Sequence, residues 1–123
     1  MVRAFRHIVH AGRNSLAGLK HLLATEMAAR IDVVAAAVAF VWLAILGRGL
    51  GDFVMLAILS CILMSVEALN TAIERIVDRT SPEISEFGRV TKDMGSTAVF
   101  FILVAAGVFL AAVTADSAGW VAL

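Results

Sequence analysis

The sequence predicts an all-α membrane protein, in which three transmembrane helices follow an amphipathic helix on the membrane surface. Two observations lead to this prediction. The 123 residues are 61% hydrophobic with a mean hydropathy of +0.94, which is more apolar side chain than a soluble domain of this size can bury. The apolar residues are also gathered into three segments separated by short polar stretches. We treat residues 1–123 as a single membrane domain, and the net charge of zero gives no indication of a nucleic-acid partner.

The first 24 residues (1–24) are expected to form the amphipathic surface helix. About 30 residues precede the first apolar segment, which is too many for the n-region of an ordinary signal peptide. Apolar residues recur at steps of three and four on one side of the expected helix, whereas basic residues lie mostly elsewhere. The apolar set is Phe5, Ile8, Val9, Leu16, Leu19 and Leu23, and the basic set is Arg3, Arg6, His10, Arg13 and Lys20.

The three expected spans are 30–48, 52–77 and 94–115. The third carries no charge and is long enough for the hydrocarbon core, which needs about 20 residues. The second is apolar from Phe53 onward and crosses if its last turns reach the interface. The first has a shorter apolar run, Val33 to Gly47, and requires its flanking charges at headgroup depth or a locally thinner bilayer.

The distribution of lysine and arginine predicts the orientation of these spans. Five such residues lie at or before the start of the first span, and Arg48 alone lies in the loop that follows it. The loop between the second and third spans is flanked by four others, which are Arg75, Arg79, Arg89 and Lys92. Because cytoplasmic loops are enriched in these residues, we expect the N-terminus and the 75–93 loop in the cytoplasm and the C-terminus outside. We therefore expect a multi-pass membrane protein in this orientation.

The end of the second span carries polar residues on one helical face. Glu67, Asn70 and Glu74 occupy positions i, i+3 and i+7, and Asp78 extends this stripe by one turn. Carboxylates at membrane depth are costly unless they are paired, hydrated or bound to a metal, so they indicate a functional site.

Other polar residues are expected at the same cytoplasmic rim. Glu26 precedes the first span, and Lys92 and Asp93 precede the third. Carboxylates with an amide suit a hard cation such as magnesium, and a lysine suits phosphate. Glu67 is the deepest carboxylate of the stripe and Glu74 lies nearer the cytoplasm, but position alone does not separate a general base from a cation ligand.

Several short motifs, in correct order and spacing, carry a resemblance to a known family. They are Ser15-Leu-Ala-Gly18-Leu, Glu26-Met-Ala-Ala-Arg30, Glu67-Ala-Leu-Asn70-Thr-Ala-Ile-Glu74, Val77-Asp-Arg79 and Lys92-Asp-Met-Gly-Ser96. Together they resemble the signature of the bacterial integral-membrane diacylglycerol kinases, from Ile8 to Val113.

This resemblance implies a homotrimer whose active sites are shared between neighbouring subunits, and transfer of the ATP γ-phosphate to diacylglycerol to give phosphatidic acid. It implies Glu67 as the general base, and Glu26 and Glu74 as ligands of Mg²⁺. The implied ATP contacts are Asn14, Glu26, Glu74, Glu83, Ile84, Ser85, Lys92 and Asp93. The implied lipid contacts are Ser15, Arg30, Glu67 and Ser96, with Asn70 and Asp78 in supporting roles.

The chain departs from the family pattern at four positions outside the acidic residues. His7 and Asn14 stand where a basic and an aromatic residue are expected, Ile31 where a glutamine is expected, and Ser85 where a histidine is expected. These departures concern the adenine-side contacts more than the phosphoryl chemistry.

Three other interpretations use the same residues. An undecaprenol kinase would share the fold and site but phosphorylate a polyprenol. A non-enzymatic oligomer would conduct ions or protons past Glu67 and Glu74 without ATP, which leaves Lys92 and Asp93 unexplained. The stripe could also serve only to hydrogen-bond helices together.

Overall fold

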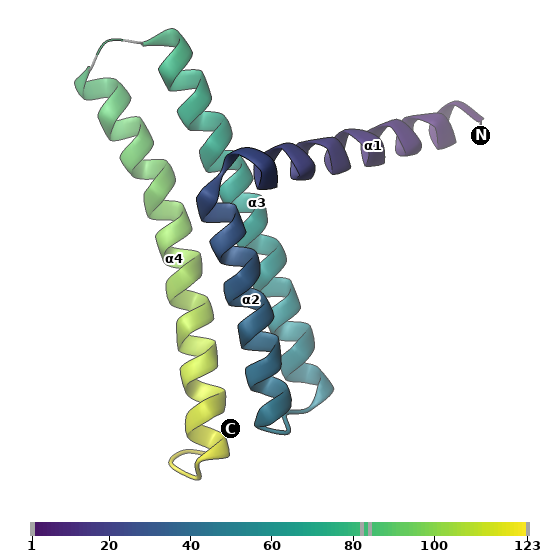
Figure 1. The fold of residues 1–123 in the computed structure, drawn as a ribbon, viewed down its shortest axis with the longest axis vertical. Coiled ribbons are helices and arrows are strands. Elements are labelled where there is room, and N and C mark those ends of the chain that lie inside the picture. The colour runs from purple at the N-terminus through teal and green to yellow at the C-terminus, as the bar shows by residue number, and fades with distance from the viewer. Residues whose placement is uncertain (1, 82, 84, 123) are drawn as a thin grey trace.

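The computed structural model describes residues 2–81, 83 and 85–122, and these form four helices without strands. They are α1 (Val2–Thr25), α2 (Met27–Ile45), α3 (Leu50–Thr80) and α4 (Glu86–Ser117). The last three run side by side as a bundle, and α1 projects away from it near the start of α2 (Figure 1). In the described part of the chain, α2, α3 and α4 are each long and apolar enough to cross a membrane. The prediction of an all-α protein with three membrane-spanning helices is therefore confirmed at this level.

The helix ends differ from the expected spans. The first span was expected to reach 48, but α2 ends at Ile45 because a turn follows, in which Gly47 has φ +66°. Glycine adopts this left-handed conformation without steric cost, so it can end a helix sharply. The third span was expected from 94, but α4 begins at Glu86. Ser85 caps it by accepting a hydrogen bond from the Gly88 N–H at 3.0 Å.

The small core lies in the half of the bundle nearer the α2–α3 turn. Ala39, Leu43, Leu56 and Val113 are buried there, with four partly buried side chains packed against them: Phe40, Phe53, Phe109 and Leu110. Most other large apolar side chains of the bundle are exposed. A soluble monomer rarely exposes so much apolar surface. In a membrane protein, lipid or a neighbouring subunit covers such a surface and keeps it from water.

The same end of the bundle is fastened by polar contacts. Arg48, in the α2–α3 turn, donates to Asp52 Oδ2 at 2.7 Å and to the Asp116 carboxylate at the end of α4. The indole N–H of Trp42 donates to Thr114 Oγ1 at 2.9 Å. We call these contacts the Arg48 clasp, which joins the α2–α3 turn and α2 to the last turns of α4.

Candidate active site

The opposite half of the bundle holds the stripe of polar residues on α3. Glu67 is its deepest member and is only 5% exposed. The charges of Asp32, Glu74 and Glu26 all lie close enough to act on Glu67, and each repels a negative charge there. These four carboxylates form a loose acidic cluster, which is spread over α2, α3 and the α1–α2 corner. A cation bound near it would relieve the repulsion between the carboxylates.

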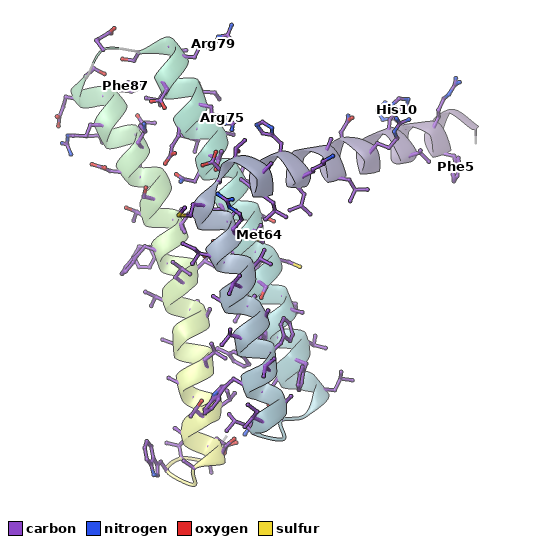
Figure 2. The ribbon with its side chains drawn as sticks, viewed as in Figure 1. Phe5, His10, Met64, Arg75, Arg79 and Phe87 are labelled. Atoms are coloured by element: carbon purple, nitrogen blue, oxygen red, sulfur yellow. The ribbon has the colours of Figure 1, made fainter. Side chains whose placement is uncertain are left out.

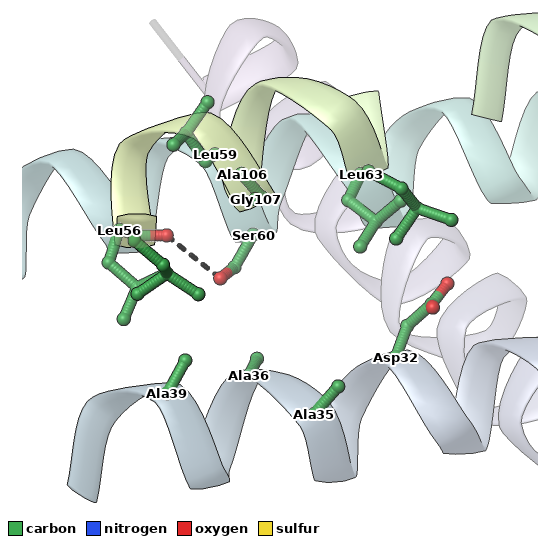
Figure 3. A pocket seen from close by; sticks show the side chains of 12 residues that line it. Asp32, Ala35, Ala36, Ala39, Leu56, Leu59, Ser60, Leu63, Ala106 and Gly107 are labelled. Atoms are coloured by element: carbon green, nitrogen blue, oxygen red, sulfur yellow. Dashed lines mark hydrogen bonds between the residues drawn. The ribbon is translucent and has the colours of Figure 1, made fainter. Parts of the chain in front are cut away.

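Asp32 is a member of this cluster that sequence reasoning missed, because it was assigned to headgroup depth. It is buried on the bundle-facing side of α2, and its Oδ2 has no hydrogen-bond partner in the described residues. It lines a mostly apolar cavity of about 230 Å³ between α2, α3 and α4, in a row with Ala35, Ala36 and Ala39 (Figure 3). That spacing of i, i+3, i+4 and i+7 marks one helical face, and it was the signal that could have found Asp32.

Asn70 lies at a close contact between α3 and α4. Its Nδ2 donates to Glu74 Oε1 at 3.1 Å, which orients the Glu74 carboxylate. On α4, Gly95 packs directly against it, because a Cβ at Gly95 would lie 2.2 Å from Asn70 Oδ1. Asn70 is thus enclosed between Glu74 and the backbone of α4, which supports its predicted role of ordering the site.

Lys92 of α4 reaches back to α3. Its Nζ forms an ion pair of 2.8 Å with Asp78 Oδ1, and Glu74 also attracts its charge. The ammonium group is therefore held beside the outer end of the stripe. Asp93 is turned elsewhere and pairs with Arg89 at 2.8 Å on the exposed side of α4.

A polar recess of about 340 Å³ opens beside Lys92 at the α3–α4 loop. It brings together several of the predicted nucleotide contacts and their neighbours, among them Asp78, Glu83, Ser85, Arg89, Lys92 and Asp93. Ile84, another predicted contact, lies outside the described residues. The lining carries both acidic and basic side chains, which suits a polar ligand.

The remaining predicted residues are exposed rather than enclosed with Glu67 within one chain. Asn14 and Ser15 are exposed on α1, which projects away from the bundle (Figure 1). Arg30 is exposed on α2 and lines an open apolar recess with Ile31, among others. Ser96 is exposed on α4. A single chain therefore brings together the acidic residues, Asn70 and Lys92, but not these four.

The donor set fits a magnesium ion only in part. No three His, Cys, Asp or Glu side chains of the described residues gather closely enough to enclose a metal. Magnesium, however, is commonly held by one or two carboxylates, and waters and substrate phosphates complete its octahedral shell. Glu26 and Glu74, which both act on the charge of Glu67, can supply two such carboxylates.

Comparison with known proteins places this site in a family. The model of the family described as prokaryotic diacylglycerol kinase matches residues 13–114, which include all of the predicted site residues. The chain belongs to this family. The resemblance inferred from the short motifs is therefore confirmed.

Individual diacylglycerol kinases show the same similarity over most of the chain. A diacylglycerol kinase of Sinorhizobium sp is 46% identical over 106 residues, 86% of this chain and 77% of that protein. Those of Escherichia coli K12 and Haemophilus influenzae are 36% and 30% identical over 102 residues. Each alignment covers 83% of this chain, with 84% and 86% of the respective relative.

Proposed function

We propose that this protein is an ATP-dependent diacylglycerol kinase of the bacterial inner membrane, which makes phosphatidic acid from 1,2-diacylglycerol. The observation that carries this proposal is the buried carboxylate of Glu67, with three further carboxylates close to it and Lys92 held at the outer end of its helix face. Family membership supports the same activity. A lipid substrate explains why the site lies between helices that can cross a membrane.

Phosphoryl transfer depends mainly on positioning and on charge stabilisation. The lipid hydroxyl oxygen attacks the γ-phosphorus, and the bond from that phosphorus to the β–γ bridging oxygen breaks as ADP leaves. Glu67 accepts the hydroxyl proton, since it is the most buried carboxylate of the stripe. Asn70 orients Glu74 through its hydrogen bond of 3.1 Å.

ATP binds from the cytoplasmic end in this proposal. Magnesium, held by Glu26 and Glu74, would neutralise charge on the β- and γ-phosphates. Lys92 exchanges its ion pair with Asp78 for a phosphate oxygen. Further nucleotide contacts come from Asn14, Glu83, Ile84, Ser85 and Asp93. The lipid is contacted by Ser15, Arg30 and Ser96.

A homotrimer would complete the site. Within one chain, Asn14 and Ser15 lie on α1, which projects away from the bundle (Figure 1). A neighbouring subunit could receive these residues and cover the exposed apolar faces of the bundle. Cytoplasmic placement of the N-terminus, with α1 in the membrane interface, follows from the lysine and arginine distribution and the amphipathic pattern of α1.

The experiment that tests this function offers diacylglycerol and undecaprenol in separate reactions to the purified protein in mixed micelles with Mg-ATP. We expect preferential formation of phosphatidic acid. Preferential formation of polyprenyl phosphate would keep the site but make the protein an undecaprenol kinase. If the folded protein phosphorylates neither lipid, the kinase assignment is contradicted. The ion-conducting oligomer would then be the favoured interpretation.

A further inference from the structure

Arg75 joins α3 to the corner between α1 and α2. Its guanidinium contacts three groups of that corner, which are His21 Nε2, Thr25 Oγ1 at 3.0 Å and Glu26 Oε1 at 3.3 Å. In sequence reasoning Arg75 was only one of the positive charges that set the membrane orientation. The contacts give it a more specific place beside Glu26, a carboxylate of the proposed magnesium site.

Glu26 is the only residue between α1 and α2, and its backbone is extended, with φ −103° and ψ 121°. It occupies the N-cap position of α2, where a side chain commonly bonds the first free N–H groups of the helix. The Glu26 side chain makes no such bond. Its carboxylate is instead held by α3 and by the neighbouring Thr25.

The two oxygens of that carboxylate are used differently. Thr25 Oγ1 donates to Oε1 at 3.0 Å, and Arg75 donates to the same oxygen at 3.3 Å. Among the described residues no hydrogen bond reaches Oε2. Arg75 and Thr25 therefore fix the orientation of the carboxylate and leave one oxygen free to bind a cation. A ligand that is already oriented loses less conformational freedom when it binds.

We propose that Arg75 is a positioning residue of the nucleotide site, which holds Glu26 so that Oε2 faces the magnesium of Mg-ATP. This inference rests on the proposed role of Glu26 as a magnesium ligand. Arg75 itself touches neither lipid nor nucleotide. Its loss should therefore weaken the binding of Mg-ATP and leave the chemical step at saturating nucleotide largely intact.

Arg79 provides a matched control. It is exposed one turn farther along α3, toward the end of that helix (Figure 2). No hydrogen bond or ion pair of Arg79 is found among the described residues. Replacing either arginine by glutamine removes one positive charge from the same cytoplasmic end, so an effect on membrane orientation or global charge would appear in both variants.

The test measures equilibrium binding of Mg-ATP, together with KM for Mg-ATP and kcat, on the purified protein in mixed micelles, for Arg75→Gln, Arg75→Lys and Arg79→Gln. Loss of hydrogen bonds to a charged carboxylate leads us to expect roughly a tenfold rise in KM for Arg75→Gln, with kcat within about twofold. Lysine keeps the positive charge but cannot donate to three acceptors from one planar group. The KM of Arg75→Lys for Mg-ATP should therefore lie between that of Arg75→Gln and that of the wild type. Arg79→Gln should match the wild type.

Size-exclusion elution and helical circular dichroism establish that each variant is folded. If Arg75→Gln does not fold, Arg75→Lys decides the test, because it retains the charge. An unchanged KM for Mg-ATP in the folded Arg75 variants would overturn the proposal. So would a fall in kcat alone, or equal effects of the Arg75 and Arg79 substitutions.

Two further variants separate this proposal from the function on which it rests. Thr25→Val removes the other bond to Oε1, and its effect on KM should be smaller in the Arg75→Gln background than in the wild type. Glu26→Gln should raise the magnesium requirement. If Glu26→Gln leaves that requirement unchanged, the assigned role of Glu26 fails. If it raises the requirement while Arg75→Gln behaves like Arg79→Gln, only the positioning role of Arg75 fails.

Discussion

Gly95 of α4 packs against the side chain of Asn70 on α3 so closely that an added Cβ would lie 2.2 Å from Asn70 Oδ1. This contact fixes the distance between the two helices at the level of the acidic stripe. It also encloses an amide whose other end orients Glu74. The spacing of α3 and α4 and the orientation of a proposed magnesium ligand thus depend on the same residue pair.

Gly95→Ala is expected to disturb both the spacing of α3 and α4 and the orientation of Glu74. Overpacking at a tight contact costs about 1–3 kcal/mol, and here the strain falls on Asn70. We expect lower thermal stability in detergent and a raised KM for Mg-ATP. Gly107→Ala on the same helix is the control, because a Cβ there meets nothing within 4 Å. Equal thermal stability and equal KM for Mg-ATP in the two variants would show that the contact with Asn70 does not matter for function.

The ion pair between Lys92 and Asp78 leads to a second prediction. Lys92→Met should raise KM for Mg-ATP by at least tenfold, since the proposed phosphate contact is lost. Asp78→Asn removes only the partner that holds the lysine at 2.8 Å. Asp78→Asn should therefore raise KM for Mg-ATP clearly less than Lys92→Met does. Kinetics at varied Mg-ATP measure both, with Lys20→Met on α1 as a control for loss of a lysine. A larger defect in Asp78→Asn than in Lys92→Met would reverse the assigned roles.

Asp32 leads to a prediction in which stability and activity move in opposite directions. A buried carboxylate with an unpartnered oxygen, whose charge also repels that of Glu67, destabilises the folded chain. Asp32→Asn keeps the shape and removes the charge, so its thermal midpoint in detergent should rise while kinase activity falls. Asp52→Asn, which breaks an ion pair with Arg48, should lower the midpoint. A lower midpoint in Asp32→Asn would mean that its charge is compensated.

The Arg48 clasp leads to a prediction about stability alone. Arg48→Met removes the contacts to Asp52 and Asp116 at the end of the bundle opposite to Glu67. We expect the thermal midpoint to fall by several degrees. KM and kcat measured well below that midpoint should stay close to the wild type. A loss of kcat in folded protein at low temperature would show that the two ends of the bundle are coupled.

The sequence predicted the parts of this architecture that depend on local pattern. Long apolar runs predict helices that can cross a membrane, and the spacing of Glu67, Asn70 and Glu74 places them on one helix face whatever the tertiary structure. The close contact of Gly95 could not be foreseen, because nothing in a single chain shows which glycine faces another helix.

Contacts between distant residues were missed for the same reason. Arg48 and Asp116 are 68 positions apart, and His21 and Arg75 are 54 apart. Arg48 and Arg75 were therefore interpreted by their charge alone. Asp32 was foreseeable, since it begins the row of small residues that ends at Ala39, but its nearness to the apolar segment boundary suggested a headgroup position instead.

The most direct test is a measurement on Glu67→Gln, which keeps the size of the side chain and removes its capacity to accept a proton. Phosphatidic acid formation and equilibrium binding of Mg-ATP are measured on the same purified protein in mixed micelles. The assignment of Glu67 as the general base predicts that turnover is abolished while the affinity for Mg-ATP stays within about threefold of the wild type. Retained turnover, or loss of nucleotide binding, would contradict it.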